Sequence, residues 1–568
     1  MAKRPGFTAI LASAALALHL FAGLSFIFSS SATYDETVHL SSGYSYLETG
    51  RYAMNIMDHP PLAEMLCALP LAFMNLKSFT AHPYFANLMP YHYGDLFLYE
   101  NTAPPGRLLN TARSFGFLAW TSVFAFFIWS FASRLESGAA AAFSLAVFSL
   151  MPVFISNDAL VTTDAAAAAF YFASFAAGWY FTEGEAGQGK PGGAGARLWR
   201  RAALAGVLSG LALVSKFSMF IVPPMVAALW LADNRLSRRM PAARLAGHIA
   251  VYAAACLLAV ALVYKFDLGL YWKGLYATLT RLDQGRSSFA FGSHSVSGVW
   301  WYFPAALLVK TPLPALGAAA AGVWLAVKNF RRGYLWLLVP PAAFFAAALS
   351  AKVQIGYRHI MPVMPFLAVL AGLALARIPG KKGAWLASGL VILNAVSVLR
   401  VHPYYLAYFN EAAGGPARGY RLLTDSNLDW GQDVRTLARY LATRGNPPVV
   451  FSYFGVARPE SAGISYVPLG VVSNVELKGA GAQVCSMKEV LLAVSATNLQ
   501  GTYYADKDTY GWLKDRKPAF DAGHSIFLYD LTSDGPGLRR LAALFDREGR
   551  NAEADCLYER AGRAEKAP

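Results

Sequence analysis

Eleven stretches of this chain are apolar and close to the length that a helix needs to cross a bilayer, which is roughly 20 residues. The chain is 56% hydrophobic with a mean hydropathy of +0.36, too apolar for an ordinary soluble protein of 568 residues. We therefore expect a mainly α-helical, polytopic membrane protein of about eleven transmembrane helices. The expected spans lie at about 7–29, 114–132, 138–156, 162–181, 202–215, 217–232, 246–264, 312–328, 334–350, 360–376 and 384–400.

Positive charge is distributed unevenly along the chain. The net charge of +15 would suit a nucleic-acid partner, but the basic residues gather in short loops between the apolar stretches, as membrane topology requires. With Lys3 and Arg4 in the cytoplasm, every second loop is basic, which predicts a cytoplasmic N-terminus and an outer C-terminal segment. The first stretch lacks a convincing signal-peptide cleavage site, so we expect a retained helix. The basic loops contain Arg134, Lys190, Arg197, Arg200, Arg201, Arg235, Arg238, Arg239, Arg244, Lys328, Arg331, Arg332, Arg377, Lys381 and Lys382.

This topology divides the chain into a membrane part, residues 1–400, and an outer C-terminal part. The membrane part has large outer loops at about 30–113 and 265–311, and a Gly-rich stretch at 183–196 is expected to be a flexible cytoplasmic linker. Residues 401–533 are predicted to form a small α/β domain of ordinary size. Residues 534–568 are predicted to be a helical tail that resembles half of a tetratricopeptide repeat. Within the α/β domain we expect a helix at 433–441 and strands at 449–453, 484–486, 491–495 and 525–531.

The four cysteines show no CxxC pair and no metal-ligand spacing. Cys256 lies inside an apolar stretch and is expected to be inert. Cys485 and Cys556 could pair if their segment lies outside the cytoplasm, but the sequence does not decide this.

Ionisable residues recur at the outer ends of the expected spans. Burying charge at a membrane boundary is costly, so such residues usually serve chemistry or ion handling. Carboxylates and cations that meet at one face indicate a site that deprotonates one group and holds an anion. The residues concerned are Asp35, Glu36, Asp58, His59, Glu64, Asp158, Asp164, Lys216, Lys310, Arg358 and His359.

Structural roles compete with functional ones at these positions. Asp35 could cap a helix that follows the first span, and Asp164 could pair with the dipole of the helix that it opens. Lys216 and Lys310 could extend to the lipid headgroups, and Arg358 with His359 could be an interfacial anchor. His59 is harder to explain in this way, because the two prolines after it fix the backbone close to the membrane.

In order and topology, these elements resemble the GT-C membrane glycosyltransferases, specifically the protein O-mannosyltransferase-like branch (glycosyltransferase family 39), which is related to the lipid A aminoarabinose transferases. His59 stands where the aminoarabinose enzymes have a lysine. The C-terminal part does not resemble the trefoil domain of eukaryotic mannosyltransferases, which favours a bacterial inner membrane and a periplasmic active face. The matching elements are Tyr34-Asp35-Glu36, Asp58-His59-Pro60-Pro61-Leu62, Thr163-Asp164, Ser215-Lys216-Phe217 and Arg358-His359-Ile360-Met361-Pro362.

The resemblance implies a polyprenyl-phosphate-sugar donor and a hydroxyl acceptor on a protein, lipid A or a cell-envelope glycan. Asp35 would be the base, Glu36 would position it or the acceptor, and Asp164 would be a second carboxylate. Asp58 would help to position the acceptor. The transfer would invert the anomeric centre and need no cofactor and no metal. Cations would stabilise the leaving phosphate, and the candidates are His59, Lys216, Arg358, His359 and Lys310.

Other functions fit parts of the pattern. A transporter or flippase of lipid-linked sugars would also expose carboxylates and cations, but transporters usually bind near the midplane between repeated halves, and no internal repeat is evident. An assembly subunit would leave the carboxylates unexplained. The Asp-rich stretch at 425–433 could bind a divalent cation, but it lacks the spacing of an EF-hand loop, and we interpret it as helix capping. The sugar and the acceptor remain open.

Overall fold

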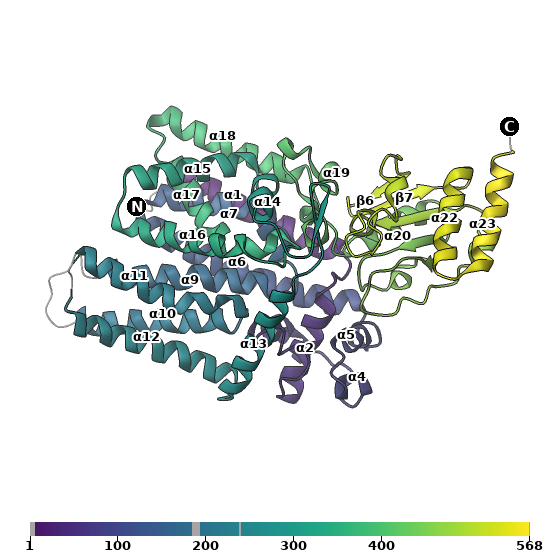
Figure 1. Cartoon of the computed structure of the whole chain (residues 1–568). Helices are drawn as coiled ribbons and strands as arrows, with labels where there is room; N and C mark the ends of the chain where they lie inside the picture. Colours follow the sequence, from purple (N-terminus) through teal and green to yellow (C-terminus); the bar gives the residue numbers. More distant parts are fainter. Residues whose placement is uncertain (1–5, 184–193, 238–239, 567–568) are drawn as a thin grey trace.

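The computed structural model describes residues 6–183, 194–237 and 240–566. A bundle of long helices forms one side of the molecule, and a sheet with its own helices forms the other (Figure 1). The predicted sites that lie outside the described residues are Lys3, Arg4, Lys190, Arg238, Arg239 and most of the expected linker at 183–196.

All eleven expected spans correspond to helices. Within the described part of the chain, seven helical segments are long and apolar enough to cross a membrane, and an eighth if α14 (Tyr302–Lys310) and α15, bent by 119°, count as one. The mainly helical membrane fold is thus confirmed, while eleven crossings remain a prediction. The helices are α1 (Phe7–Ser29), α6 (Pro105–Leu135), α7 (Gly138–Ser149), α9 (Asp164–Glu183), α10 (Ala194–Leu213), α11 (Val222–Ser237), α12 (Ala242–Val263), α15 (Leu313–Lys328), α16 (Leu335–Leu349), α17 (Met364–Ala376) and α18 (Gly380–Leu399).

The third expected span is not one continuous helix. Helix α7 ends at Ser149, and the separate helix α8 covers Pro152–Asn157. A proline has no N–H to donate and disfavours the helical conformation of the residue before it. The expected span at 138–156 is therefore divided between two helices, and whether it crosses the membrane stays a prediction. Helix α10 also begins earlier than expected, at Ala194 instead of 202.

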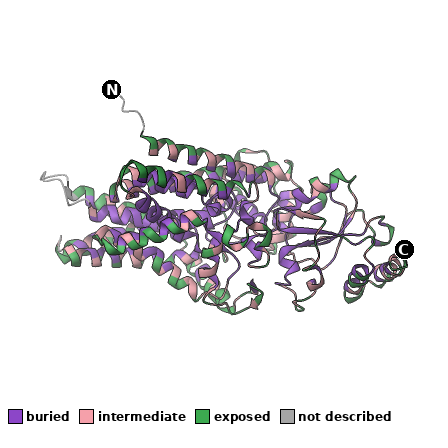
Figure 2. Ribbon diagram, turned by 90° about the horizontal axis from the view of Figure 1, so that it is seen from above, coloured by how far each residue is buried: buried purple, intermediate pink, exposed green. Residues whose placement is uncertain are grey.

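Burial separates the inner helices of the bundle from the outer ones (Figure 2). Helices α7 and α17 are buried over most of their length, and α9 is buried almost throughout. The outer helices expose large apolar side chains, such as Phe21 and Phe28 of α1 and Phe126 of α6. A contiguous exposed apolar face is costly in water, so these faces suit contact with lipid acyl chains.

The outer loops fold into short elements at one end of the bundle. The first loop contains α2 (Glu36–Thr49), α3 (Leu62–Ala68), α4 (Pro83–Ala86) and α5 (Pro90–Tyr99). The second contains α13 (Leu268–Gln284) and a hairpin of β1 (Ser288–Ala290) and β2 (Ser293–Ser295).

The C-terminal part contains a five-stranded mixed sheet with strand order β4-β3-β5-β7-β6. The central strand β5 (Leu491–Ser495) pairs in parallel with β3 (Val449–Ser452) and antiparallel with β7 (Ile526–Asp530). The outer strands are β4 (Tyr466–Pro468) and β6 (Phe520–Ala522). Three of the four predicted strands are confirmed, but 484–486 is a 3-10 turn that carries Cys485.

Helices flank this sheet. The predicted helix at 433–441 is α20 (Val434–Thr443), and the predicted helical pair is α22 (Gly535–Arg547) with α23 (Asn551–Ala564). Cys485 forms a disulfide with Cys556 of α23. The bond ties this helical pair to the turn before β5, a connection that the sequence left undecided.

Candidate functional site

Asp35 occupies the N-cap position of α2, directly after the extended segment that follows α1. Its side chain accepts no capping hydrogen bond from the described residues. Instead, its Oδ2 lies 3.2 Å from Nη2 of Arg358, and about a quarter of the side chain remains exposed. The helix-cap interpretation of Asp35 is therefore wrong, and the carboxylate faces a cation.

Arg358 links two carboxylates that come from distant parts of the chain. It lies in a 3-10 turn just before α17, and its Nη1 donates to Oδ2 of Asp164 at 2.8 Å. The other terminal nitrogen faces Asp35, and Nε donates to the hydroxyl of Ser426 at 3.0 Å. The planar guanidinium has donors in a fixed fork, so these contacts set its orientation. Arg358 is thus a positioned cation and not a mobile interfacial anchor.

Lys216 completes the cluster from the break between α10 and α11. Its ammonium contacts Oδ1 of Asp164 at 2.5 Å. Asp164, at the first position of α9, is therefore held between two cations. Because the side chain of Lys216 is only about a fifth exposed, it does not simply extend into the headgroup region.

His59 approaches the same cluster from the first outer loop. Its Nδ1 lies 3.4 Å from the hydroxyl of Thr163, and its ring packs edge-on against His39. Burial, together with the charges of His39 and Lys216, lowers the pKa of His59 well below its usual value. His59 is consequently neutral at physiological pH and can offer a hydrogen bond but no full charge.

Glu36 is engaged differently from its neighbour. It is fully buried, and its carboxylate accepts hydrogen bonds from the backbone and hydroxyl of Thr33, the backbone of Val161 and the guanidinium of Arg113. Burial alone would raise the pKa of Glu36, but Arg113 and these hydrogen bonds bring it below the ordinary value. Glu36 therefore fixes the start of α2 against α6.

The C-terminal part supplies one wall of the site. Trp430 lies under the guanidinium of Arg358, 4.0 Å from ring centre to carbon, and its carbonyl accepts from the backbone of Tyr34 at 2.9 Å. Ser426, as described above, holds Nε of Arg358.

The interpretation of 425–433 as helix capping is wrong, because the side chain of Asp433 makes no cap for α20 within the described structure.

Arg286, which the sequence analysis did not identify, lies beside this wall. Arg286, from the loop between α13 and β1, interacts electrostatically with Asp425 and Asp35, and its Nε donates to the hydroxyl of Tyr503 at 3.1 Å. The hydroxyl of Tyr503 in turn donates to Asp425. Burial raises the pKa of Asp425. The only sequence signal for this arrangement was the density of aspartates after residue 424.

Two predicted site residues, Lys310 and Asp58, form contacts outside the cluster around Arg358. The buried ammonium of Lys310 donates to the carbonyls of Leu406 and Asn427, so it braces the C-terminal part instead of binding a donor phosphate. Asp58 forms an ion pair with Arg281 of α13 and is half exposed. We therefore correct both expectations.

The ring of His359 stacks near Phe303 and stays within electrostatic reach of Lys216 and Arg358.

The remaining outer carboxylates also lie apart from the cluster. Glu64 pairs with His39 behind His59, at 2.8 Å between Oε1 and Nδ1. Asp158 is buried, and neither of its oxygens has a hydrogen-bond partner among the described residues, so burial raises its pKa well above the usual value. Burial also raises the pKa of Asp429 to about 8 and that of Asp433 to about 7. In the described ranges, no three His, Cys, Asp or Glu side chains gather as metal ligands would.

Solved structures with this fold exist, although no protein-family model and no curated protein matches the sequence. The crystal structure of ArnT from Cupriavidus metallidurans bound to undecaprenyl phosphate is similar with a TM-score of 0.52 and 13% identity, over 91% of this chain and 97% of that one. The apo state of the same ArnT gives 0.50 and 12% over the same shares. An archaeal oligosaccharyltransferase, AglB from Archaeoglobus fulgidus, gives 0.46 and 12% over 85% and 69%. The two ArnT structures confirm the expected GT-C fold.

Proposed function

We propose that this chain is an integral membrane glycosyltransferase that moves a sugar from a polyprenyl-phosphate donor to a hydroxyl acceptor at the periplasmic face. The observation that carries the proposal is Arg358, which is fixed between Asp35 and Asp164 at the outer end of the bundle. Transfer from a lipid phosphate needs a base for the acceptor hydroxyl and a cation for the leaving phosphate. Asp35 and Arg358 supply such a pair at the end of the bundle. The ArnT structure of the same fold binds undecaprenyl phosphate, which supports a donor of this class.

Each residue of the cluster has a role in this transfer. The acceptor hydroxyl gives its proton to Asp35 while its oxygen forms a bond to the anomeric carbon. The bond from that carbon to the phosphate oxygen breaks, and the electron pair leaves with the polyprenyl phosphate. Arg358 and Lys216 stabilise the negative charge on the leaving phosphate, with His59 and His359 as hydrogen-bond partners. Attack from the face opposite the phosphate inverts the anomeric centre.

Asp164 acts mainly through the cations. It lies between Arg358 and Lys216 and holds both before the donor arrives. A preorganised charge costs no reorganisation during the reaction. Because the leaving group is a monophosphate carried by a lipid, the step as written uses no metal ion and no cofactor. The sugar is a mannose, another hexose or a pentose, and the acceptor lies on a protein, lipid A or an envelope glycan.

The disulfide supports the placement of residues 401–533 and 534–568 outside the cytoplasm. Disulfides persist in oxidising compartments such as the bacterial periplasm and are rare in the cytosol. The bond between Cys485 and Cys556 lies in the part of the chain that supplies Ser426 and Trp430. This agrees with an active face on the periplasmic side of residues 1–400.

The test is a transfer assay with the full chain in membranes and radiolabelled polyprenyl-phosphate mannose, glucose and aminoarabinose. We expect label to pass to an acceptor from one donor, and transfer to be lost in Asp35→Asn at unchanged expression. Asp283→Asn, which removes the same charge from an exposed position on α13, is the matched control. If the lipid-linked sugar crosses the bilayer without being consumed, the chain is a flippase and the proposal is wrong.

A further inference from the structure

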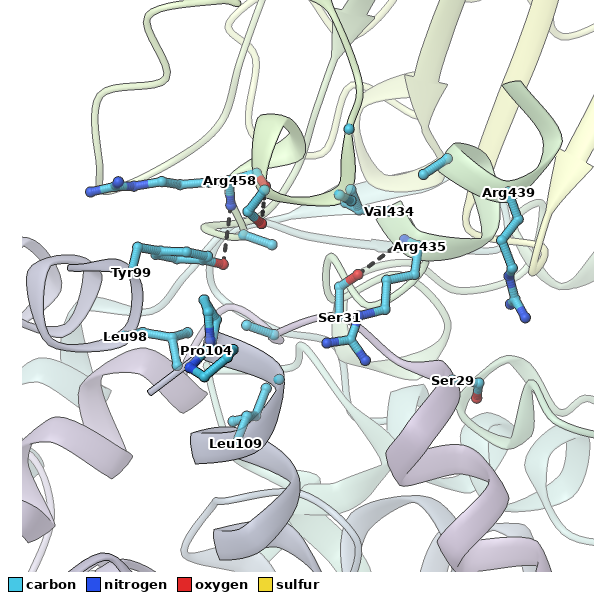
Figure 3. A pocket seen from close by; sticks show the side chains of 18 of the residues that line it. Ser29, Ser31, Leu98, Tyr99, Pro104, Leu109, Val434, Arg435, Arg439 and Arg458 are labelled. Atoms are coloured by element: carbon cyan, nitrogen blue, oxygen red, sulfur yellow. Dashed lines mark hydrogen bonds between the residues drawn. The ribbon is translucent and has the colours of Figure 1, made fainter. Parts of the chain in front are cut away.

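A cavity of about 730 Å³ lies between the bundle and the C-terminal part. Its walls are the outer end of α1, the junction of α5 and α6, helix α20 and the segment 457–463 (Figure 3). Phe28, Leu98, Pro104 and Leu109 form an apolar side. The opposite side carries arginines of the C-terminal part, so the cavity is apolar towards the bundle and cationic towards the sheet.

Two of its three arginines have no acidic partner in the described part of the chain. Arg458 is neutralised by Asp95 and Glu100, each 2.6 Å away. In contrast, no carboxylate of the described ranges lies within ion-pair distance of Arg435 or Arg439. Their guanidinium groups donate hydrogen bonds to the carbonyl of Phe28 and the hydroxyl of Thr436. The cavity therefore keeps two cationic side chains whose charge is not balanced by the protein.

One face of α20 presents these side chains to the cavity. Arg435, Ala438, Arg439 and Ala442 all line it, and residues three and four apart share a helix face. Leu437 and Leu441, on the opposite face, are buried in the C-terminal part, whereas Val434 at the start of α20 also lines the cavity. The small side chain of Ala438, between the two arginines on this face, leaves room for a ligand beside both guanidinium groups.

The start of α6 adds to the positive potential. This 31-residue helix begins at Pro105, and the N-terminus of a helix carries a partial positive charge. Gly106, at its second position, leaves space for Arg435: a Cβ there would lie 2.7 Å from Nη2 of that arginine. A side chain at 106 would displace the guanidinium from the start of the helix.

The cavity lies where the lipid-facing surface ends. Phe28, in the last turn of α1, lines the cavity and is 62% exposed. Further along the same helix Phe21 is exposed, and on α6 so are Phe115 and Leu118. An acyl chain that lies along α1 and α6 would bring its headgroup to the two unpaired arginines.

We propose that this cavity binds the phosphate headgroup of an anionic membrane lipid. Arginine recognises phosphate through parallel, charge-assisted hydrogen bonds, and Arg435 and Arg439 supply two such forks over one cavity. The apolar wall contacts the first carbons of the acyl chains, which a soluble anion lacks. This site is separate from the cluster around Arg358 and does not depend on the proposed transfer reaction.

The test is lipid binding to the purified full chain in detergent, measured by calorimetry with short-chain phosphatidylglycerol. Phosphatidylcholine of the same chain length and inorganic phosphate are the comparison ligands. We expect phosphatidylglycerol to bind most tightly and each of Arg435→Gln and Arg439→Gln to weaken it about tenfold, the order expected for one hydrogen bond to a charged group. Arg540→Gln, at an exposed position of α22, removes the same charge elsewhere and should leave binding unchanged.

A second variant keeps the test decisive if an arginine substitution disturbs folding. Ala438→Trp fills the cavity without changing its charge and should abolish lipid binding while transfer activity and melting temperature persist. Equal affinity for phosphatidylcholine, unchanged binding in Arg435→Gln/Arg439→Gln, or complete displacement by inorganic phosphate at the lipid's own concentration would each overturn the proposal.

Discussion

Arg358 stacks on Trp430, with the guanidinium carbon 4.0 Å from the ring centre. The first residue belongs to the membrane bundle and the second to the C-terminal part, so the candidate site lies at the contact between them. The same arginine is held by Ser426. The C-terminal part is therefore a structural component of the site and not an appended domain.

Substitution of Trp430 should lower turnover without unfolding the protein. Removing the ring frees Arg358 on one side, and cation–π contacts of desolvated arginines are worth about 2 kcal/mol, so Trp430→Ala should reduce kcat about 30-fold. Trp430→Phe keeps an aromatic face and should retain most activity. Steady-state transfer rates with melting temperatures measured in parallel would check this, and an unchanged kcat in Trp430→Ala would show that the stack is incidental.

Arg358→Lys should be far more damaging than its conserved charge implies. A lysine cannot reach Asp35, Asp164 and Ser426 together, because it lacks the planar fork. We expect kcat to fall about 100-fold, the usual effect of removing one preorganised transition-state donor. Arg281→Lys, in the half-exposed pair with Asp58, is the control. Equal activity of Arg358→Lys and wild type would remove Arg358 from the phosphate site.

Glu36→Gln should act on stability. Breaking a buried ion pair costs about 3–5 kcal/mol, and both Glu36 and Arg113 are fully buried. The pKa of Glu36 is lowered on folding from an ordinary value of 4.5, so its stabilisation is complete above that pH and is lost as the pH falls below it. The difference in melting temperature between wild type and Glu36→Gln should thus be large at pH 7 and shrink below about pH 4.5. A constant difference across this range would show that the charge does not matter.

His59 should act as a neutral hydrogen-bond partner. Burial and the neighbouring cations lower the pKa of His59 well below its usual value of 6.5, which disfavours the charged imidazolium. His59→Gln should keep the KM for the donor within about threefold, whereas His59→Ala should raise it about tenfold, the order expected for a lost charge-assisted hydrogen bond. A titration of donor KM near pH 6.5 that disappears in His59→Gln would instead establish a cationic role.

The disulfide gives a test of topology. Cys485 and Cys556 are bonded to each other, so, with the proposed periplasmic location of the C-terminal part, a membrane-impermeant thiol reagent should label them in intact cells only after reduction. Cys67 and Cys256 are buried and should stay unlabelled, which provides an internal control. Labelling that requires cell lysis would place the C-terminal part in the cytoplasm. Removing the bond by Cys556→Ser should also lower stability by about 2–4 kcal/mol.

The helices were predictable because apolar length is a local property. The span expected at 7–29 coincides with α1. The basic loops between spans can likewise be recognised from local sequence, without knowledge of the tertiary structure. The break at Pro152 was visible in the sequence but was outweighed by the apolar run around it. Strands were correct where β-branched and aromatic residues clustered, as in β3 and β7, and wrong at 484–486, where three residues are too few to decide.

The site was predictable only in part, because residues at span ends look alike in sequence. Lys216 and Lys310 both close an apolar stretch, yet one meets Asp164 and the other meets backbone carbonyls. Asp35 and Glu36 are adjacent, yet one faces Arg358 and the other is enclosed by Arg113. Ser426 is 68 positions from the arginine that it holds, and no local pattern reveals a contact of that kind.

The hydrogen bond between Arg358 and Ser426 has a consequence for biosynthesis. The ribosome completes the whole bundle up to α18 before it reaches the residues that lock Arg358 in place. A nascent chain that has already inserted its helices thus still has a loosely held arginine between its two carboxylates. Under the proposed function, transfer therefore requires that the C-terminal part has docked on the bundle, and a chain truncated after α18 should insert into the membrane without consuming lipid-linked sugar.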